Sequence, residues 1–118
     1  MIEDDEHLCK VVAATLRGHA YDVMIARDGI AALQVLETFE PNVIVLDLAM
    51  SGLDGHGFLA AREERGDLVG VPVIVTSGAP ATRDLASSTW DEFLLKPYCL
   101  PDLLAAIERR CVARHAHR

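Results

Sequence analysis

The sequence predicts an α/β protein in which a five-stranded parallel sheet is flanked by five helices on its two faces, the doubly wound arrangement. Two short apolar runs, Val43 to Leu46 and Val71 to Val75, are rich in β-branched residues and do not alternate with polar residues. Strands buried on both faces show this pattern. Helical patterns lie between and around the two runs. The 118 residues, 51% hydrophobic and 25% charged, suit one domain over residues 1–118 with no separate output domain.

The N-terminal third of the chain predicts two strands and two helices. Only Met1 and Ile2 precede an acidic run, whereas a buried strand is usually about five residues long, so we expect the first strand to be incomplete. A weaker second strand is predicted from Asp22 to Ala26. Asp28 suits the cap of the second helix. The apolar residues at helical spacing are Leu8, Val11, Val12 and Leu16 for the first helix and Ala32, Leu33 and Leu36 for the second.

The C-terminal part predicts the last strand and the last helix. A weaker strand is expected from Phe93 to Leu95. Pro101 and Asp102 then suit the first turn of a helix, because proline needs no donor there and a carboxylate favours the positive end of the helix dipole. That helix has the clearest apolar periodicity of the chain, at Leu100, Leu103, Leu104, Ile107 and Cys111.

Composition narrows the function classes. A net charge of -7 and a pI near 5.1 argue against direct contact with nucleic acid, which requires clustered Lys and Arg, and favour proteins and small cations as partners. Cys9, Cys99 and Cys111 are widely spaced and odd in number, so neither a disulfide framework nor a zinc site is indicated. No apolar run approaches the ~20 residues of a membrane span, and no signal peptide is evident. We therefore expect a cytoplasmic protein without membrane contact.

Polar residues follow the predicted strands at the ends that converge in a doubly wound sheet. Three carboxylates brought together there would repel one another, which makes sense if a hard divalent cation such as Mg²⁺ lies among them. A lysine and a hydroxyl would complete a site for a phosphoryl group. The lysine is notable because the chain has only one other, Lys10. The residues concerned are Glu3 and Asp4, Asp47, Thr76 and Ser77, and Lys96.

Four stretches in order resemble the response regulator receiver domain, the CheY-like phosphoacceptor of two-component signalling. The resemblance covers nearly the whole chain and implies a flavodoxin-like fold. The stretches are Ile2-Glu3-Asp4-Asp5-Glu6, the run Val45-Leu46-Asp47-Leu48-Ala49-Met50-Ser51-Gly52-Leu53-Asp54-Gly55, Pro72-Val73-Ile74-Val75-Thr76-Ser77, and Phe93-Leu94-Leu95-Lys96-Pro97.

The resemblance implies a role for each of these residues. Asp47 would be the phosphoacceptor. Mg²⁺ would be held by Glu3, Asp4, Asp47 and the backbone carbonyl of Ala49, whereas Asp5 and Glu6 are better read as charges at the start of the first helix. Thr76, Ser77 and Lys96 would contact the phosphoryl group. Thr76 and Phe93 would form the switch, and the Lys96-Pro97 bond would be cis.

The same resemblance implies partners. A sensor histidine kinase or a phosphotransfer protein would supply the phosphoryl group, and a downstream protein or a second copy would bind the face made by the fourth helix, fifth strand and fifth helix. The domain would not be an enzyme in the ordinary sense, although it would assist its own phosphorylation and dephosphorylation. Ala49 and Gly78 occupy the two positions that orient the attacking water in this family, and neither side chain can hydrogen-bond to water.

Two other function classes remain as alternatives. An aspartyl-phosphate hydrolase of the haloacid dehalogenase type also places an Asp after an apolar strand. It would need a second acid where this chain has Ala49, and a later acidic pair where the chain offers only Asp102. A receiver fold used only as a docking module is the other alternative, and the complete set of polar residues argues against it.

Overall fold

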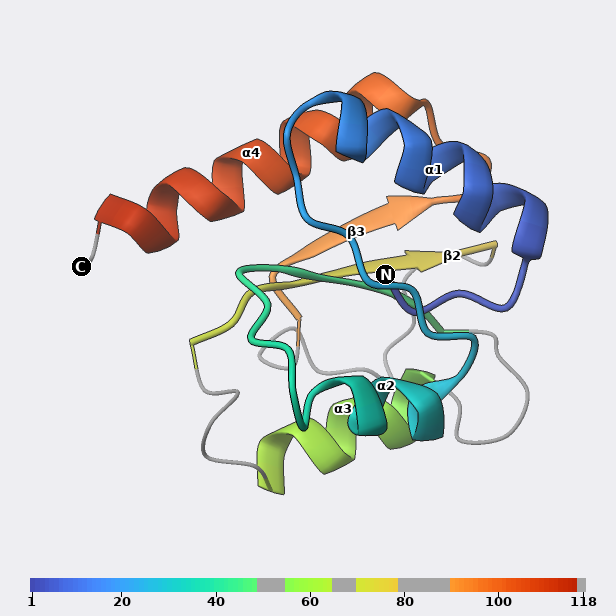
Figure 1. Cartoon of the computed structure of the whole chain (residues 1–118), viewed down its shortest axis with the longest axis vertical. Coiled ribbons are helices and arrows are strands. Elements are labelled where there is room, and N and C mark those ends of the chain that lie inside the picture. The colour runs from blue at the N-terminus through green and yellow to red at the C-terminus, as the bar shows by residue number, and fades with distance from the viewer. Residues whose placement is uncertain (49–54, 65–69, 79–89, 117–118) are drawn as a thin grey trace.

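The computed structural model has a parallel sheet between two layers of helices (Figure 1). It describes residues 1–48, 55–64, 70–78 and 90–116. In Figure 1, α1 and α4 cover one face of the sheet, and α2 and α3 cover the other. The elements are α1 (Glu6–Gly18), α2 (Gly29–Val35), β1 (Ile44–Asp47), α3 (Gly55–Glu64), β2 (Val73–Ser77), β3 (Glu92–Leu95) and α4 (Leu100–Ala116).

The strands run in the order β1-β2-β3, with both pairs parallel. Ile2 forms parallel bridges to Ala26 on one side and to Leu46 on the other. The order across the sheet is therefore Ala26, Ile2, β1, β2, β3. From Ile2 the chain first crosses to Ala26 on one side and then returns to add β1, β2 and β3 on the other side. The change of side lies between Ile2 and β1, and doubly wound sheets bind ligands at such a switch point.

Five strands were predicted, and three are present as strands in the described part of the chain. The first and second are each reduced to a single bridge, at Ile2 and Ala26. A strand forms only where a neighbouring strand supplies donors and acceptors. Residues 22–26 have only Met1 and Ile2 beside them, so they form a single bridge.

The two faces of the sheet bury separate apolar cores, as the alternation of side chains along each strand requires. On the α2–α3 face, Leu46 and Val75 pack with Phe58 of α3. On the α1–α4 face, Val45 and Ile74 pack with residues of α1 and α4 such as Val12, Leu103 and Ile107. All residues of β1 and β2 are buried, which confirms the interpretation of these non-alternating runs as central strands.

The helix starts agree with the predictions from local sequence. The Asp28 side chain accepts a hydrogen bond from the Ala31 N–H at 2.7 Å and caps α2. Asp5 caps α1 by accepting from the Leu8 N–H at 3.1 Å, so its carboxylate is engaged at the helix start, as expected. The fourth predicted helix falls on residues outside the described ranges. Among the described helices, none is long and apolar enough to cross a membrane.

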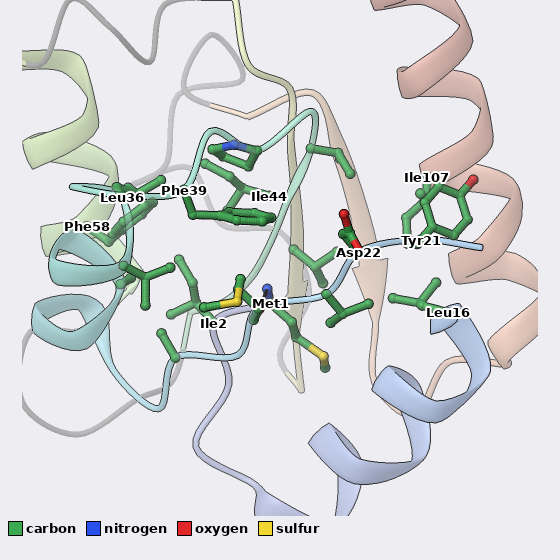
Figure 2. Close-up of a pocket in the computed structure, with 18 residues that line it drawn as sticks. Met1, Ile2, Leu16, Tyr21, Asp22, Leu36, Phe39, Ile44, Phe58 and Ile107 are labelled. Carbon is green, nitrogen blue, oxygen red and sulfur yellow. Dashed lines mark hydrogen bonds between the residues drawn. The ribbon is translucent and has the colours of Figure 1, made fainter. Parts of the chain in front are cut away.

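A cavity of about 90 Å³ lies beside Met1, on the N-terminal side of the bridge at Ile2 (Figure 2). Its walls are mostly apolar and come from both faces of the sheet. Phe39 and Phe58 lie on the α2–α3 side, and Leu16 and Ile107 on the α1–α4 side. The cavity is at the opposite end of the strands from the polar residues singled out above.

Candidate functional site

The candidate site is built on a row of three polar residues at the carboxyl ends of adjacent strands. Asp47 is the last residue of β1 and lies opposite Thr76 in the register of β1 and β2. The bridge from Ile2 to Leu46 places Glu3 beside Asp47 on the other side. Glu3, Asp47 and Thr76 have exposed fractions of 1%, 3% and 1%. Two carboxylates and a hydroxyl are thus buried side by side.

The backbone holds this row in place. The Asp47 N–H donates to the Ile2 carbonyl at 2.9 Å, and the Glu3 N–H donates to the Ala26 carbonyl at 2.9 Å. The Leu48 N–H donates to the Thr76 carbonyl at 3.1 Å. Because these bonds belong to the sheet ladder, the side chains of the row are fixed by the register of the strands.

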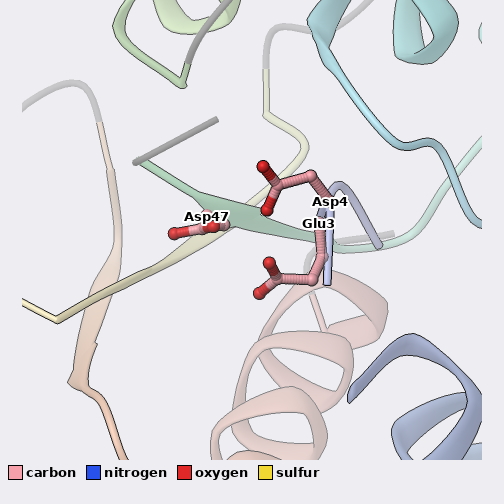
Figure 3. Close-up of side chains that lie close together, drawn as sticks. All are labelled: Glu3, Asp4 and Asp47. Carbon is pink, nitrogen blue, oxygen red and sulfur yellow. The ribbon is translucent and has the colours of Figure 1, made fainter. Parts of the chain in front are cut away.

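Asp4 adds a third carboxylate next to the row. One ligand oxygen from each of Glu3, Asp4 and Asp47 lies within 4.8 Å of the others. Figure 3 shows the carboxylates of Glu3 and Asp4 both directed toward Asp47. Glu3 and Asp47 are buried, whereas Asp4 is exposed and leaves the group open to solvent. Hard oxygen ligands partly open to water are what Mg²⁺ and Ca²⁺ require.

Lys96 brings one positive charge to these carboxylates. It follows β3 directly, and its N–H donates to the Ser77 carbonyl at 2.7 Å, which anchors it at the edge of the site. Its Nζ lies 2.6 Å from Glu3 Oε1 and 3.5 Å from Asp47 Oδ2. Burial alone would lower the pKa of Lys96, but the hydrogen bond to Glu3 and the charge of Asp47 raise it above its ordinary value. Lys96 is therefore a permanent cation at neutral pH.

One lysine does not compensate for the buried carboxylates. Burial raises the pKa of Glu3, and the neighbouring Asp47 raises it further, although the hydrogen bond from Lys96 acts in the opposite direction. The net shift is upward, so the site disfavours a full set of negative charges. A divalent cation among Glu3, Asp4 and Asp47 would relieve this repulsion, and the donor set fits such an ion.

The structure brings together most of the residues predicted for the site. Glu3, Asp4, Asp47, Thr76 and Lys96 lie at one end of the sheet, as expected. Thr76 and Ser77, which were expected to follow their strand, instead form its last two residues, because the ladder to β3 continues to Ser77 and Leu95.

The remaining residues predicted for the site, Ser77, Phe93 and Ala49, are not part of this group. Alternation along β2 directs the Ser77 side chain to the α2–α3 face, away from that of Thr76. Phe93 lies opposite Val75 and stacks in a tilted arrangement on Trp90, with ring centroids 5.8 Å apart. Ala49 lies outside the described residues.

Tyr98 is a residue that the sequence did not assign to the site. Its pKa is raised to about 12, first by burial and then by the charges of Glu3 and Asp47. Its hydroxyl is buried without a hydrogen-bond partner in the described part of the chain. The sequence feature that could have indicated Tyr98 is its position just after Lys96 and Pro97. The Lys96-Pro97 peptide bond is cis, as predicted.

Comparison with protein families gives a match to the response regulator receiver domain over residues 1–108. Among curated relatives, the DNA-binding response regulator MtrA of Mycolicibacterium paratuberculosis is 28% identical over 93% of this chain and 49% of its own length. The probable transcriptional regulator ycf27 of Porphyridium aerugineum is 30% identical over 91% of this chain and 45% of its own length. The chain thus spans about half the length of the curated relatives it matches.

Solved structures share the fold over nearly the whole chain. The receiver domain of the Francisella response regulator 1452 superposes with a TM-score of 0.82 at 26% identity, covering 95% of this chain and 93% of that one. The receiver domain of the sensor histidine kinase PA1611 from Pseudomonas aeruginosa, described with a magnesium ion coordinated in its active site cleft, has a TM-score of 0.82 at 24% identity over 93% of each chain. These likenesses establish the flavodoxin-like receiver fold.

The relatives bear on two of the expectations above. They are regulators, so they give no support to the haloacid dehalogenase alternative. Several are named as DNA-binding response regulators, so they do not support the expectation of no direct contact with nucleic acid. The net charge of -7, on which that expectation rested, describes only the residues of this chain.

The burial of Glu3 predicts that Lys96→Met destabilises the fold at pH 7 in buffer without divalent cations, by about 1–3 kcal/mol. The substitution leaves two buried carboxylates without their cation and raises the pKa of Glu3 further. A carboxyl whose folded pKa is raised stabilises the fold below its unfolded value and loses that contribution as pH rises through the folded pKa. The deficit of the variant should therefore be small near pH 4.5 and grow toward pH 7, as measured by urea unfolding.

Lys10→Met is the matched control. Lys10 is 3.9 Å from Glu6, and both side chains are well exposed, at 73% and 64%. Removing an exposed pair should change the unfolding free energy by less than about 0.5 kcal/mol at any pH. Equal costs for the two variants, or a cost for Lys96→Met that does not vary with pH, would contradict the role given to the Glu3 carboxylate.

Proposed function

Because the chain belongs to the response regulator receiver family, we propose that it is a phosphorylation switch in which Asp47 accepts a phosphoryl group. The observation that carries this proposal is the row of Glu3, Asp47 and Thr76, with Lys96 Nζ 3.5 Å from Asp47 Oδ2. The arrangement supplies a nucleophilic carboxylate, a fixed cation and a hydroxyl within one end of the sheet. We further propose that the receiver domain occupies the whole of residues 1–118.

The phosphoryl donor in this proposal is a phosphohistidine of a sensor histidine kinase or of a phosphotransfer protein. A carboxylate oxygen of Asp47 attacks the phosphorus in line. The new O–P bond of an acyl phosphate forms as the P–N bond breaks, and the electron pair leaves with the imidazole. Lys96 acts as a point charge toward the phosphoryl oxygens, and Thr76 donates a hydrogen bond from its hydroxyl. Ser77 stands at the same strand end, but its side chain would have to reach around that end.

Glu3, Asp4 and Asp47, with the backbone carbonyl of Ala49, would hold Mg²⁺. Such an ion, when bound, neutralises charge on the carboxylates and on the phosphoryl oxygens. Two similar folds support this assignment by their descriptions: the PA1611 receiver domain has coordinated magnesium, and the response regulator TrrA of Thermotoga maritima was described in complex with Mg²⁺ and BeF. The raised pKa of Glu3 supports it from within this chain.

Phosphorylation would add about two negative charges at Asp47. In the proposal, Thr76 turns toward the phosphoryl group and Phe93 changes its packing on β3. The face that includes β3 and α4 would respond, together with the fourth predicted helix. A downstream protein or a second copy of the chain would recognise that face, and in a longer protein the partner could be a DNA-binding part, as the names of the relatives suggest.

Trp90 offers a direct test against a receiver fold that only docks. It is the only tryptophan and stacks on Phe93, so its fluorescence reports on the proposed switch residue. Adding beryllofluoride with Mg²⁺, which imitates the acyl phosphate, should change the Trp90 emission in a saturable way. A docking module without a phosphoryl site would give no saturable change.

Asp4→Ala should abolish Mg²⁺ binding, because it removes the exposed carboxylate of the three that would hold the ion. Binding to the parent is expected in the weak range of sites with few protein ligands and several waters. Isothermal titration or the shift of Tm with Mg²⁺ would measure it. Asp5→Asn is the control: asparagine keeps the helix cap, so that variant should still bind Mg²⁺. Unchanged binding in Asp4→Ala would remove the acidic pair from the site.

Asp47→Asn should prevent labelling by acetyl phosphate in the presence of Mg²⁺, since an amide is not a nucleophile of comparable strength. Intact-mass measurement would show one added phosphoryl group on the parent and none on the variant. Asp102→Asn, in the exposed first turn of α4, should label like the parent. A stoichiometric, base-labile phosphoryl group on Asp47→Asn would show that the acceptor is another residue.

The phosphorylated form should be long-lived, because Ala49 and Gly78 offer no side-chain group to orient an attacking water. Losing a contact that orients the water raises the barrier to hydrolysis, and every increase of about 1.4 kcal/mol slows hydrolysis about tenfold. Gly78 is exposed and a Cβ there would meet open space, so a larger residue fits. Ala49→Asn with Gly78→Glu should accelerate phosphate release from the labelled protein. A parent half-life of seconds that the double variant does not shorten would disprove this explanation.

A further inference from the structure

The side chain of Trp90 stacks on a residue of the proposed switch, although it takes no part in the phosphoryl site itself. Trp90 lies just before β3, and its ring centroid is 5.8 Å from that of Phe93, with 55° between the ring planes. Both rings are partly buried and pack against the core on the α2–α3 face. An aromatic pair at this separation stabilises the arrangement in which the rings meet. Phe93 therefore cannot leave its present packing without separating from Trp90 or moving it.

The position of Trp90 decides which way the stack acts. The Asp91 N–H donates to the carbonyl of Val73, the first residue of β2, at 2.8 Å. Trp90 therefore precedes a residue at the amino end of the sheet. Thr76 lies near the carboxyl end of β2, beside the phosphoryl site. The stack thus holds the Phe93 ring toward the amino end, and a movement of that ring after Thr76 has to overcome the stack.

Ring packing, and not a hydrogen bond, holds the indole of Trp90. Its Nε1 is buried and has no hydrogen-bond partner among the residues that the structure describes. Burial of an unpaired donor has a free-energy cost, which the packing of the ring must offset. Phenylalanine at this position keeps a ring against Phe93 without that N–H, whereas leucine keeps an apolar side chain without a ring. The two substitutions therefore separate stacking from burial alone.

We propose that Trp90 is a positioning residue of the switch, because its stack on Phe93 stabilises the packing that precedes phosphorylation and opposes the rearranged one. The stack separates when Thr76 turns toward the phosphoryl group and Phe93 follows. A contact made in only one of two states shifts their equilibrium by its own free energy, so Trp90 sets how strongly the switch resists rearrangement. The inference rests on the proposed function, since it requires Phe93 to respond to the phosphoryl group on Asp47.

The affinity for beryllofluoride in the presence of Mg²⁺, measured by isothermal titration, tests the proposal. Trp90→Leu should bind about two- to tenfold more tightly than the parent, because the stack no longer opposes the rearranged state. Trp90→Phe should bind like the parent, since a ring still meets Phe93. Phe39→Leu is the matched control, because Phe39 is also a partly buried aromatic residue but lines the cavity beside Met1. Its affinity should equal that of the parent.

Mg²⁺ alone separates an effect on the switch from general damage to the fold. The acidic cluster that would hold the ion contains neither Trp90 nor Phe39. All three variants should therefore bind Mg²⁺ as the parent does. Weaker Mg²⁺ binding by Trp90→Leu would mean that the substitution disturbs the site directly, which contradicts a role confined to Phe93.

Fluorine NMR of the parent tests the same point without a substitution at Trp90. Because Trp90 is the only tryptophan, fluorotryptophan gives a single resonance that senses the neighbouring ring. Beryllofluoride with Mg²⁺ should move this resonance toward its position in Phe93→Leu, where no stack exists. A resonance that stays in place while titration shows binding would overturn the proposal.

The other outcomes of the titration are equally decisive. Equal or weaker beryllofluoride binding by Trp90→Leu would show that the stack does not oppose the rearranged state. Tighter binding by Trp90→Phe as well would assign the effect to the indole and not to stacking. Tighter binding by Phe39→Leu would assign it to a loosened apolar core. A parent that binds no beryllofluoride would remove the proposed function and this inference with it.

Discussion

The burial of Glu3 and Asp47 side by side is the constraint on which the rest of the site depends. Two adjacent carboxylates in a poorly solvated position repel each other and lose hydration, and the raised pKa of Glu3 expresses both costs. Lys96, just after β3, offsets part of that cost. The carboxylates in turn stabilise the charged form of Lys96, which is why its pKa is raised. The site has an excess of negative charge that a cation relieves, which is why the geometry suits Mg²⁺ and a phosphoryl group together.

The sheet supplies the precision that this chemistry requires. Asp47 and Thr76 lie opposite each other on β1 and β2, Glu3 follows the bridge at Ile2, and ladder bonds fix each one. A slip of one residue in either register would direct the side chain concerned to the other face. The apolar residues of the two strands oppose such a slip, since those on one face pack in one core and those on the other face pack in the second core. The apolar strands thus position the polar residues that follow.

Local sequence patterns predicted the elements that depend on local physics. Asp28 and Asp5 cap their helices because capping involves residues only three positions apart. The strand from Asp22 to Ala26 is reduced to one bridge, because a strand depends on its neighbour as much as on its own residues. The two faces of the site also differ from what spacing alone suggests: Ser77 and Thr76 are adjacent in sequence, yet strand alternation directs their side chains to opposite faces.

The sequence by itself determined the fold class, the strand ends at which Glu3, Asp4, Asp47, Thr76 and Lys96 would gather, and hence the kind of site to expect. These follow from the order of buried strands, because the carboxyl ends of parallel strands meet at one edge. Only the tertiary structure decided that Lys96 pairs more closely with Glu3, at 2.6 Å, than with Asp47, at 3.5 Å. Lys96 and Glu3 are 93 residues apart in the chain, and their distance and burial arise from packing that no local pattern encodes.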